Sequence, residues 1–525
     1  MSDKVNKKSV VIIGAGPAGL SCAYKLLEES TEFEVNIIEE SSFVGGISRT
    51  EVHNGNRMDM GGHRFFTKDK SVEEFWNKIL PPQGKPAFDD LILNRTPLLC
   101  TDGPDPEIED RVMLHRKRIS RIYYGNHFFD YPLSLKISTI FNLGIITTIK
   151  VGFSYLYSCI FKRGETNLEN FYINRFGKKL YQMFFEDYTQ KLWGIHPSSI
   201  SSDWGAQRVK GLSIRKILTS MLFGWIKNHN TKNQETSLIE NFSYPKYGPG
   251  QLWSEVLSHV QKKGATIKFN CQVRGVVVKN SKVESVICKN DRGEEIKIPT
   301  DILISSMPLS TLALSIQNEV PNDRVIQVAK GLKFRSFITV GLLLSKLKLK
   351  NNSQIKTISD IPPDCWIYIQ DRRVKMGRIQ IFNNWSCYLV KDVKNTVWLG
   401  LEYFCNEGDE FWNKTDIELK NIALSELKLM DIIDEDSLIL DYCCSRVAKA
   451  YPAYFGTYKD IDVIINYINS INNIYCVGRN GQHRYNNMDH SVLTAFRCVD
   501  HILNRDVTRD DIWKVNTEKV YHEST

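Results

Sequence analysis

Short apolar runs that lead into a glycine-marked turn and then into a helical pattern recur along this chain. The first, Val10 to Ile13, precedes the sequence GAGPAG at residues 14–19 and an apolar helical pattern up to Leu27. The last, Ile474 to Val477, precedes a polar loop and a helical pattern over residues 492–503. Apolar runs bounded by glycine turns are typical of buried parallel strands, so these segments predict a Rossmann-like unit.

Other parts of the chain show the alternation or the spacing of different elements. Residues 313–462 predict a mainly antiparallel sheet with one helix, which starts at a capping box of Thr415 and Glu418. Residues 129–228 have a helical pattern, and residues 91–128 alternate short apolar runs with polar turns, which predicts strands. The predicted sheet strands are Phe334–Leu343, Trp366–Gln370, Arg378–Asn383 and Thr396–Phe404, and the predicted helices of the 129–228 segment are Leu168–Leu180, Met183–Trp193 and Trp204–Leu222.

The first glycine turn carries a dinucleotide-binding pattern. Gly14 permits the tight turn, Gly16 lets the backbone approach a pyrophosphate, and Gly19 allows close helix packing. The second strand ends at Glu39, where a carboxylate accepts the ribose hydroxyls of an adenosine. With Gly45, Gly46 and Arg49 added beyond it, the segment resembles flavoproteins with two dinucleotide-binding domains and favours FAD over NAD. A purely structural βαβ unit is the alternative.

These patterns together predict an α/β plus α+β chain. A discontinuous Rossmann-like FAD-binding domain would comprise residues 1–90, 229–312 and 463–508, with a helical insertion at 129–228. A mainly antiparallel substrate domain would comprise residues 91–128 and 313–462, followed by a C-terminal tail at 509–525. A chain of 525 residues is long enough for two or three domains.

Four further segments hold candidate site residues. Gly61 and Gly62 allow a backbone to lie against a flat ring with His63 beside it, although a lone histidine more often serves packing. Val273 follows a predicted strand at a position that meets adenine in such folds. Trp366, Tyr368 and Arg378 would share one face of a strand pair, with core packing as the alternative for Trp366. The loop from Gly478 to Ser491 precedes a helix start at Met488, so it would bind a ligand or, alternatively, form a solvated surface.

Composition narrows the function classes. A net charge of +8 is mild and the basic residues are dispersed, which favours anionic small molecules and gives no indication of nucleic acid. Twelve cysteines without a CxxC pair indicate reduced thiols and a cytoplasmic protein, and the polar first residues do not suggest a signal peptide. The apolar segment 137–161 contains polar residues, so we expect a buried or peripheral helix and no membrane contact.

Several motifs in the same order resemble the UDP-galactopyranose mutase family, and its eukaryotic-type members more closely than the bacterial ones. The sequences GGISRT and DMGGHRFF resemble its flavin segment, and YPKYGPGQLW its second flavin loop. The sequences YTQKLWG and DWGAQRV resemble the family's substrate helices, and WIYIQD resembles the hairpin that carries its arginine. The sequences AYPAY and GRNGQHRYNNMDHS resemble its diphosphate and sugar site. The chain departs from the family's nucleotide pocket at Ser134 and Thr189, which leaves the base open.

The resemblance implies a reaction and roles for residues. The chain would interconvert pyranose and furanose forms of a UDP-hexose through an adduct at N5 of reduced FAD, with NAD(P)H as a candidate reductant. A nucleotide sugar would be the substrate, and a homo-oligomer is left open. The implied catalytic residues are His63, Arg378 and Arg479, the substrate-binding residues are Tyr131, Trp193, Arg208, Trp366, Tyr368, Tyr451, Tyr485 and Asn487, and Gly478 and Met488 would join the flavin site.

Two other functions remain compatible with these motifs. An FAD-dependent oxidoreductase of the amine oxidase or protoporphyrinogen oxidase type shares the flavin motifs and the helical insertion, but it needs no arginines converging on a diphosphate. A non-catalytic flavoprotein or membrane-peripheral scaffold would use the apolar segment 137–161. The sequence shows no metal cluster, Ser-His-Asp set or carboxylate pair, so a bound cofactor would carry the covalent chemistry.

Overall fold

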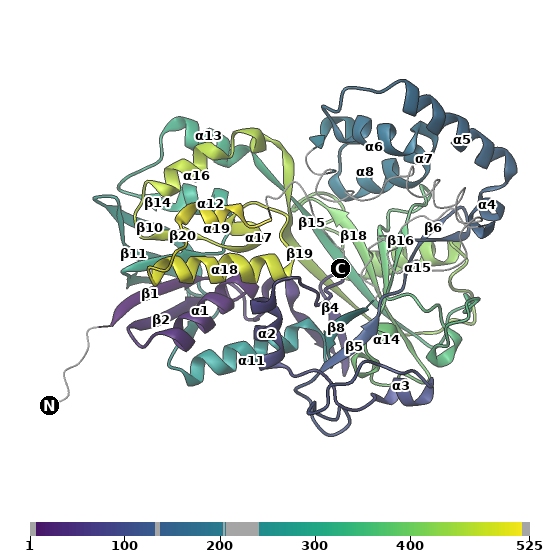
Figure 1. Cartoon of the computed structure of the whole chain (residues 1–525), viewed down its shortest axis with the longest axis horizontal. Coiled ribbons are helices and arrows are strands. Elements are labelled where there is room, and N and C mark those ends of the chain that lie inside the picture. Colours follow the sequence, from purple (N-terminus) through teal and green to yellow (C-terminus); the bar gives the residue numbers. More distant parts are fainter. Residues whose placement is uncertain (1–6, 132–136, 203–204, 206–240, 517–525) are drawn as a thin grey trace.

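The computed structural model describes residues 7–131, 137–202, 205 and 241–516 (Figure 1). Apart from Gly205, the predicted helix Trp204–Leu222 lies outside these residues, and so do Arg208 and Ser134. No helix among the described residues combines the length and apolarity needed to cross a bilayer.

A five-stranded parallel sheet forms the first part of the fold. Its strand order is β20-β13-β1-β2-β9, which brings together segments from both ends of the chain and its middle. Helices α1, α11 and α18 pack on one face, where their apolar side chains join those of the strands, and α12, α13 and α16 contribute to the core on the other face. The five strands are β1 Lys8–Ile13, β2 Phe33–Ile38, β9 Thr266–Lys268, β13 Ile302–Ser305 and β20 Ile474–Cys476.

A seven-stranded, mainly antiparallel sheet forms the second part of the fold. Its order is β19-β15-β18-β17-β16-β6-β7, and only the β16–β6 pair is parallel in the described sheet. Side chains of strand β15 alternate between the two faces of the sheet. Ile338 and Val340 pack toward α15, while Phe337 faces the core shared with the helical insertion. The seven strands are β6 Ser120–Tyr124, β7 His127–Asp130, β15 Leu332–Leu344, β16 Trp366–Ile369, β17 Arg378–Ile381, β18 Val397–Cys405 and β19 Ile439–Gly456.

Smaller sheets and helices complete the fold. A four-stranded sheet consists of β12 Glu295–Pro299, β11 Lys282–Lys289, β10 Gln272–Lys279 and β14 Ile316–Gln317, and two ribbons pair β3 Thr50–His53 with β4 Asn56–Asp59 and β5 Met113–Lys117 with β8 Asn241–Pro245. The helices are α1 Pro17–Glu29, α2 Lys70–Ile79, α3 Phe88–Ile92, α4 Ile137–Leu143, α5 Ile145–Ile160, α6 Leu168–Phe176, α7 Lys178–Tyr181, α8 Asp187–Trp193, α11 Pro249–Lys262, α12 Leu309–Ser315, α13 Asp323–Gly331, α14 Phe382–Trp385, α15 Asp416–Leu429, α16 Asp462–Asn469, α17 Gly478–Gly481, α18 Met488–Ile502 and α19 Arg509–Lys514.

Two local features follow directly from the sequence. Asn280 and Ser281, both with positive φ, form the tight turn between β10 and β11. The Thr415 hydroxyl accepts from the Glu418 amide while the Glu418 carboxylate accepts from the Thr415 amide, so the capping box starts α15 as expected.

Other predicted elements are wrong in extent. The helix expected over Leu168–Leu180 ends at Phe176, because Gly177 has a φ of 78° and restarts the chain as α7. The strand expected to continue to Asn383 ends at Ile381, where α14 begins. Residues 91–128 hold strands only from Met113 onward, since α3 and irregular chain occupy the first part.

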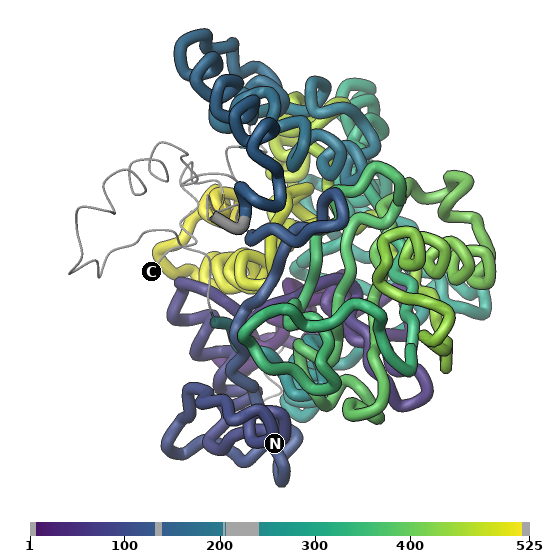
Figure 2. Tube along the Cα trace, turned by 90° about the vertical axis from the view of Figure 1, so that its right-hand side faces the viewer, coloured from purple at the N-terminus to yellow at the C-terminus, as the bar shows by residue number. Residues whose placement is uncertain are grey.

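The helices α4 to α8 form a separate lobe beside the seven-stranded sheet. Figure 1 places them at the upper right, away from the parallel sheet, and Figure 2 shows the same segment projecting at the top. The lobe packs on the sheet through buried aromatic side chains such as Tyr172, Tyr181 and Phe184. The site described below lies between the two large sheets.

Candidate functional site

The larger of two adjoining cavities lies where the parallel strands end. It has a volume of about 430 Å³, and its walls include Gly14 and Gly16 from the β1–α1 turn, Glu39 after β2 and Val273 at the start of β10. The carboxyl ends of parallel strands meet at one edge of such a sheet, which is where nucleotides bind in open α/β folds.

Three glycines let backbone segments pass close together along one wall of this cavity. Gly14 has a φ of 99°, and a Cβ there would lie 2.2 Å from Ser306 Oγ. A Cβ on Gly46 would lie 3.3 Å from the Gly16 Cα, so the two backbones pass close together. A Cβ on Gly19 would lie 1.9 Å from the Gly14 carbonyl oxygen, so this glycine serves helix packing. The turn with the N-terminus of α1 above it fits the diphosphate of a dinucleotide.

Two charged residues flank this wall. The Glu39 carboxylate accepts from the Ala15 and Ser41 amides at 2.8 and 2.9 Å and still borders the cavity, as a ribose partner must. Arg49 also borders it, but its guanidinium is ion-paired with Glu51 at 2.7 Å. Gly45, which has a φ of 95°, starts the turn that carries Gly46 and Arg49.

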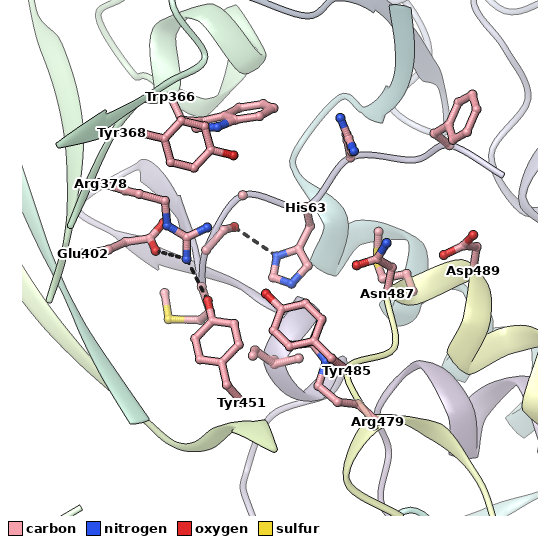
Figure 3. Close-up of a pocket in the computed structure, with 17 residues that line it drawn as sticks. His63, Trp366, Tyr368, Arg378, Glu402, Tyr451, Arg479, Tyr485, Asn487 and Asp489 are labelled. Atoms are coloured by element: carbon pink, nitrogen blue, oxygen red, sulfur yellow. Dashed lines mark hydrogen bonds and ion pairs between the residues drawn. The ribbon is translucent and has the colours of Figure 1, made fainter. Parts of the chain in front are cut away.

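The second cavity, of about 150 Å³, lies between the Gly61–Gly62 backbone and the seven-stranded sheet (Figure 3). His63, Arg479, Asn487 and Met488 line both cavities and therefore form their common boundary. A flat ring that continues from the dinucleotide site would reach this boundary. The other residues of the second cavity include Trp366, Tyr368, Arg378, Glu402, Tyr451 and Tyr485.

Arg378 is held by a carboxylate and a phenol. Its Nη2 lies 2.6 Å from Glu402 Oε2 and donates to the Tyr451 hydroxyl at 2.7 Å. Burial alone would lower the pKa of Arg378, but the Glu402 carboxylate, together with nearby phenol groups such as that of Tyr451, more than offsets this and holds the pKa well above its ordinary value. The Arg378 Nε is buried without a hydrogen-bond partner among the described residues. The guanidinium is therefore charged, with its Nη2 held by Glu402 and Tyr451 and its Nε–H left unpaired within the described part of the protein.

Arg479 approaches the same phenol from α17. Its Nε and Nη1 donate to the carbonyl oxygens of Asn486 and Ala450 at 2.7 and 3.2 Å. Its guanidinium carbon lies 5.0 Å from the ring centroid of Tyr485 and 5.8 Å from that of Tyr451, and these two rings are stacked 5.5 Å apart. The structure thus brings both predicted arginines to one cavity, with Tyr451 between them.

His63 is a neutral group at the cavity boundary. Its Nδ1 lies 3.0 Å from the Gly61 carbonyl oxygen, which fixes the ring against the glycine pair. Burial, together with the positive charges of Arg479 and Arg378, lowers the pKa of His63 to about 3. The imidazole therefore acts as a shape and hydrogen-bonding element near neutral pH.

Aromatic side chains form the wall opposite His63. Strands β16 and β17 pair with Trp366 opposite Gln380 and Tyr368 opposite Arg378, which confirms the predicted shared face. The ring centroids of Tyr131 and Tyr368 lie 4.6 Å apart, so Tyr131 extends this wall without lining the cavity itself.

Trp193 does not meet the other predicted site residues. It is only 1% exposed and packs edge-on against Phe455 in the core between the helical lobe and the sheet. Thr189, in the same helix, is buried as well. In this structure Trp193 therefore packs in the core and lines neither cavity.

The sequence reasoning missed two acidic residues, Glu402 and Asp489. Glu402 is the one charged residue in β18, an otherwise apolar strand whose nine residues are all buried. A carboxylate in such a strand requires a partner, and this was the available signal. Asp489 lies in the first turn of α18 at the cavity, and burial raises its pKa.

Comparison with known proteins matches this architecture. Residues 12–79 match the family model of an NAD(P)-binding Rossmann-like domain. The structure is similar to a crystal structure of reduced UDP-galactopyranose mutase, with a TM-score of 0.74, 19% sequence identity, and coverage of 98% of this chain and 100% of that one. It is also similar to cyclohexylamine oxidase from Brevibacterium oxydans, with a TM-score of 0.58, 11% identity, and coverage of 95% and 100%.

Sequence comparison gives a relative that matches part of the chain. Coproporphyrinogen III oxidase of Staphylococcus aureus is 22% identical over 298 residues, which is 55% of this chain and 59% of the relative. The match therefore spans less than two thirds of that relative. Together the comparisons confirm the predicted fold class, a Rossmann-like nucleotide-binding domain joined to a mainly antiparallel sheet domain.

Proposed function

We propose that this chain is an FAD-dependent mutase that interconverts pyranose and furanose forms of a UDP-hexose. The observation that carries the proposal is the convergence of Arg378 and Arg479 on one cavity beside the Gly61–Gly62 backbone. Two guanidinium groups around a shared phenol suit a diphosphate, whereas an amine substrate, which is itself a cation near neutral pH, would be repelled by them.

FAD is the proposed occupant of the larger cavity. The backbone at Gly14, Gly16 and Gly46 would leave room for its diphosphate. Glu39 would accept hydrogen bonds from its ribose hydroxyls, and Val273 would contact its adenine. The isoalloxazine would lie along Gly61 and Gly62, with His63 at its edge. When bound and reduced, FAD supplies the electron pair that displaces the nucleotide from the anomeric carbon, and the cycle involves no net redox change.

The protein's own contribution is electrostatic. Departure of the nucleoside diphosphate builds negative charge on its oxygens, and Arg378 and Arg479, which both line the cavity, would stabilise that charge. Arg378 would act through the charge of its guanidinium, which borders the cavity and is held at Nη2 by Glu402 and Tyr451. Glu402 then keeps the guanidinium charged and correctly oriented before the substrate binds.

The aromatic wall would hold the nucleoside. Tyr368 borders the cavity beside Arg378 (Figure 3), Tyr131 lies next to it with the ring centroids 4.6 Å apart, and both flat rings can stack on a base. Tyr485 and Asn487, near the N-terminus of α18, would contact the sugar or the diphosphate. Tyr451 would orient both arginines through its hydroxyl and ring.

The test is a panel of nucleotide sugars incubated with the purified yellow protein, with and without dithionite. Pyranose-to-furanose conversion that requires the reduced flavin supports the proposal. Conversion of no member of the panel by a protein with full flavin content would refute it.

An FAD-dependent amine or porphyrinogen oxidase is the second candidate. The likeness to cyclohexylamine oxidase and to coproporphyrinogen III oxidase favours it. Such an enzyme would consume oxygen steadily with an amine or a tetrapyrrole, and it would not isomerise a nucleotide sugar under dithionite.

A further inference from the structure

Helix α5 exposes its apolar side chains and turns its small polar ones inward. Its inner face carries Ser154 and Ser158, and the Ser154 hydroxyl oxygen accepts from the Lys179 amide at 2.9 Å. The chain passes so close there that a Cβ on Gly177 would lie 2.8 Å from the Tyr155 Cα. This is the reverse of a surface helix that packs its apolar stripe on a core.

The outward face is long and continuous. With Phe141 of α4 at its start and Phe161 at its end, it spans both helices on the outer edge of the helical lobe (Figure 1). Its exposed side chains are Phe141, Ile145, Ile146, Ile149, Phe153, Leu156, Tyr157, Ile160 and Phe161, each between 53% and 77% exposed. Apolar faces of this size on a soluble domain mark an interaction surface.

The charge pattern points to an anionic partner. Residues 131–164 contain no Asp or Glu, and Lys150, Lys162 and Arg163 lie along or beside the face. Exposed Lys150 sits among the apolar side chains on α5. A symmetric pairing of two copies would bring these cations against one another without a carboxylate to balance them. Phosphate headgroups of a lipid surface supply the missing negative charge.

The length of the helix decides how it would meet a bilayer. Sixteen residues at about 1.5 Å each give about 24 Å, shorter than the hydrocarbon thickness of about 30 Å. A helix with an apolar side and flanking cations lies in the interface plane instead. Aromatic rings such as Phe153 and Tyr157 are suited to that depth.

We propose that α4 and α5 form a docking surface that lies in the headgroup region of an anionic phospholipid bilayer and holds the protein peripherally on it. This goes beyond the proposed sugar-nucleotide chemistry and does not depend on it. It also departs from the expectation that segment 137–161 makes no membrane contact, because the sequence did not reveal which side of the helix faces outward.

The test is flotation of the full-length, flavin-loaded protein with vesicles of phosphatidylcholine alone or mixed with phosphatidylserine. The native chain should float with the anionic vesicles. The double variant Phe153→Ser with Leu156→Ser should bind at least about tenfold more weakly, and Lys150→Gln about fivefold more weakly with a smaller salt dependence. These positions are exposed, so both variants should keep the native unfolding temperature.

The matched control is Ile417→Ser with Leu429→Ser, which removes two apolar side chains, 58% and 48% exposed, from α15. This control should float like the native chain. Three results would overturn the proposal: no flotation of the native chain with either vesicle, equal loss in the control, or a Phe153→Ser change that converts a dimer in solution to a monomer and leaves flotation unchanged. The last result would identify the face as a contact between copies.

Discussion

Arg378 and Glu402 form an ion pair of 2.6 Å in the cavity wall, and the Glu402 side chain is only 1% exposed. Burying two charges costs free energy unless each satisfies the other, and removing one partner leaves the other uncompensated. The pair therefore fixes the arginine in a charged state before any ligand arrives. Burial raises the pKa of Glu402 while Arg378 opposes that rise, so the carboxylate depends on the arginine as well.

Removing this carboxylate gives a first prediction. Glu402→Ala should lower the free energy of unfolding by about 3–5 kcal/mol, because the Arg378 charge stays buried without its partner. Excess UDP should restore more stability to the variant than to the native chain, since its diphosphate would replace the lost negative charge. Urea titrations with and without UDP measure both effects.

A solvent-exposed pair is the control. Glu435, paired with Lys428 at 2.8 Å and 88% exposed, should cost less than about 1 kcal/mol on replacement by Ala. Equal losses at the two sites, or no difference in the response to UDP, would contradict the role given to Glu402.

His63 predicts a pH dependence of stability. Its folded pKa of about 3 lies below the ordinary value of 6.5, so between these values the unfolded chain binds more protons than the folded one. The contribution of His63 is fully present above pH 6.5 and is lost as the pH falls toward 3. As the pH is lowered from 7.5 to 5, the urea concentration at the midpoint of unfolding should therefore fall more steeply for the native chain than for His63→Gln.

An exposed histidine separates this effect from general acid sensitivity. His127 lies exposed at the start of β7, and His127→Gln should follow the native curve. Parallel curves for the native chain and His63→Gln would show that the imidazole is not held neutral in the folded state.

Replacing Gly478 by alanine should reduce the amount of bound cofactor. This glycine has a φ of 76°, and a Cβ there would lie 2.7 Å from the Ala18 Cβ, so Gly478→Ala should push α17 away from α1 and reduce the bound flavin. Gly264 has a φ of 101° with open space around it, so Gly264→Ala carries only the backbone strain. The flavin-to-protein absorbance ratio should fall in the first variant and stay native in the second. Equal ratios would remove Gly478 from the cofactor site.

Lys191 predicts a positioning effect on the β16–β17 hairpin. Its Nζ donates to the carbonyl oxygens of Ile369, Asp371 and Met376 at 3.3, 2.7 and 3.1 Å, and burial lowers its pKa to about 8. Lys191→Met should loosen the hairpin that carries Arg378 and lower kcat/KM for the nucleotide sugar by about a hundredfold. Native activity should decline above pH 8 as the ammonium deprotonates, and the variant should lack that limb.

Lys375 offers the control on the same hairpin, since it is exposed and its Nζ lies over the Phe411 ring at 4.5 Å. Lys375→Met should keep native kcat/KM. An unchanged pH profile in Lys191→Met would assign the alkaline limb to another group and sink the positioning role.

The sequence predicted those parts of the site that follow from local periodicity. Trp366, Tyr368 and Arg378 share a face because side chains alternate along a strand, and the Gly14 turn follows from spacing alone. The role of Glu402 was not predicted, because its pairing with Arg378 depends on strand β17 lying beside strand β18 in the folded sheet. The sequence could not tell that Trp193 is buried away from the cavity, because a tryptophan at the end of an amphipathic helix fits a core and a binding site equally well.

The central claim is that Arg378 and Arg479 stabilise a departing diphosphate beside a reduced flavin. Its most direct test is the turnover of UDP-galactopyranose by the dithionite-reduced protein and by Arg378→Ala, Arg479→Ala and Arg372→Ala, the last an exposed arginine with a 66% exposed side chain. The account predicts native turnover in Arg372→Ala and losses of about two to three decades in the other two, each with flavin retained. Undiminished turnover in Arg378→Ala and Arg479→Ala, or no furanose from the native chain, would contradict it.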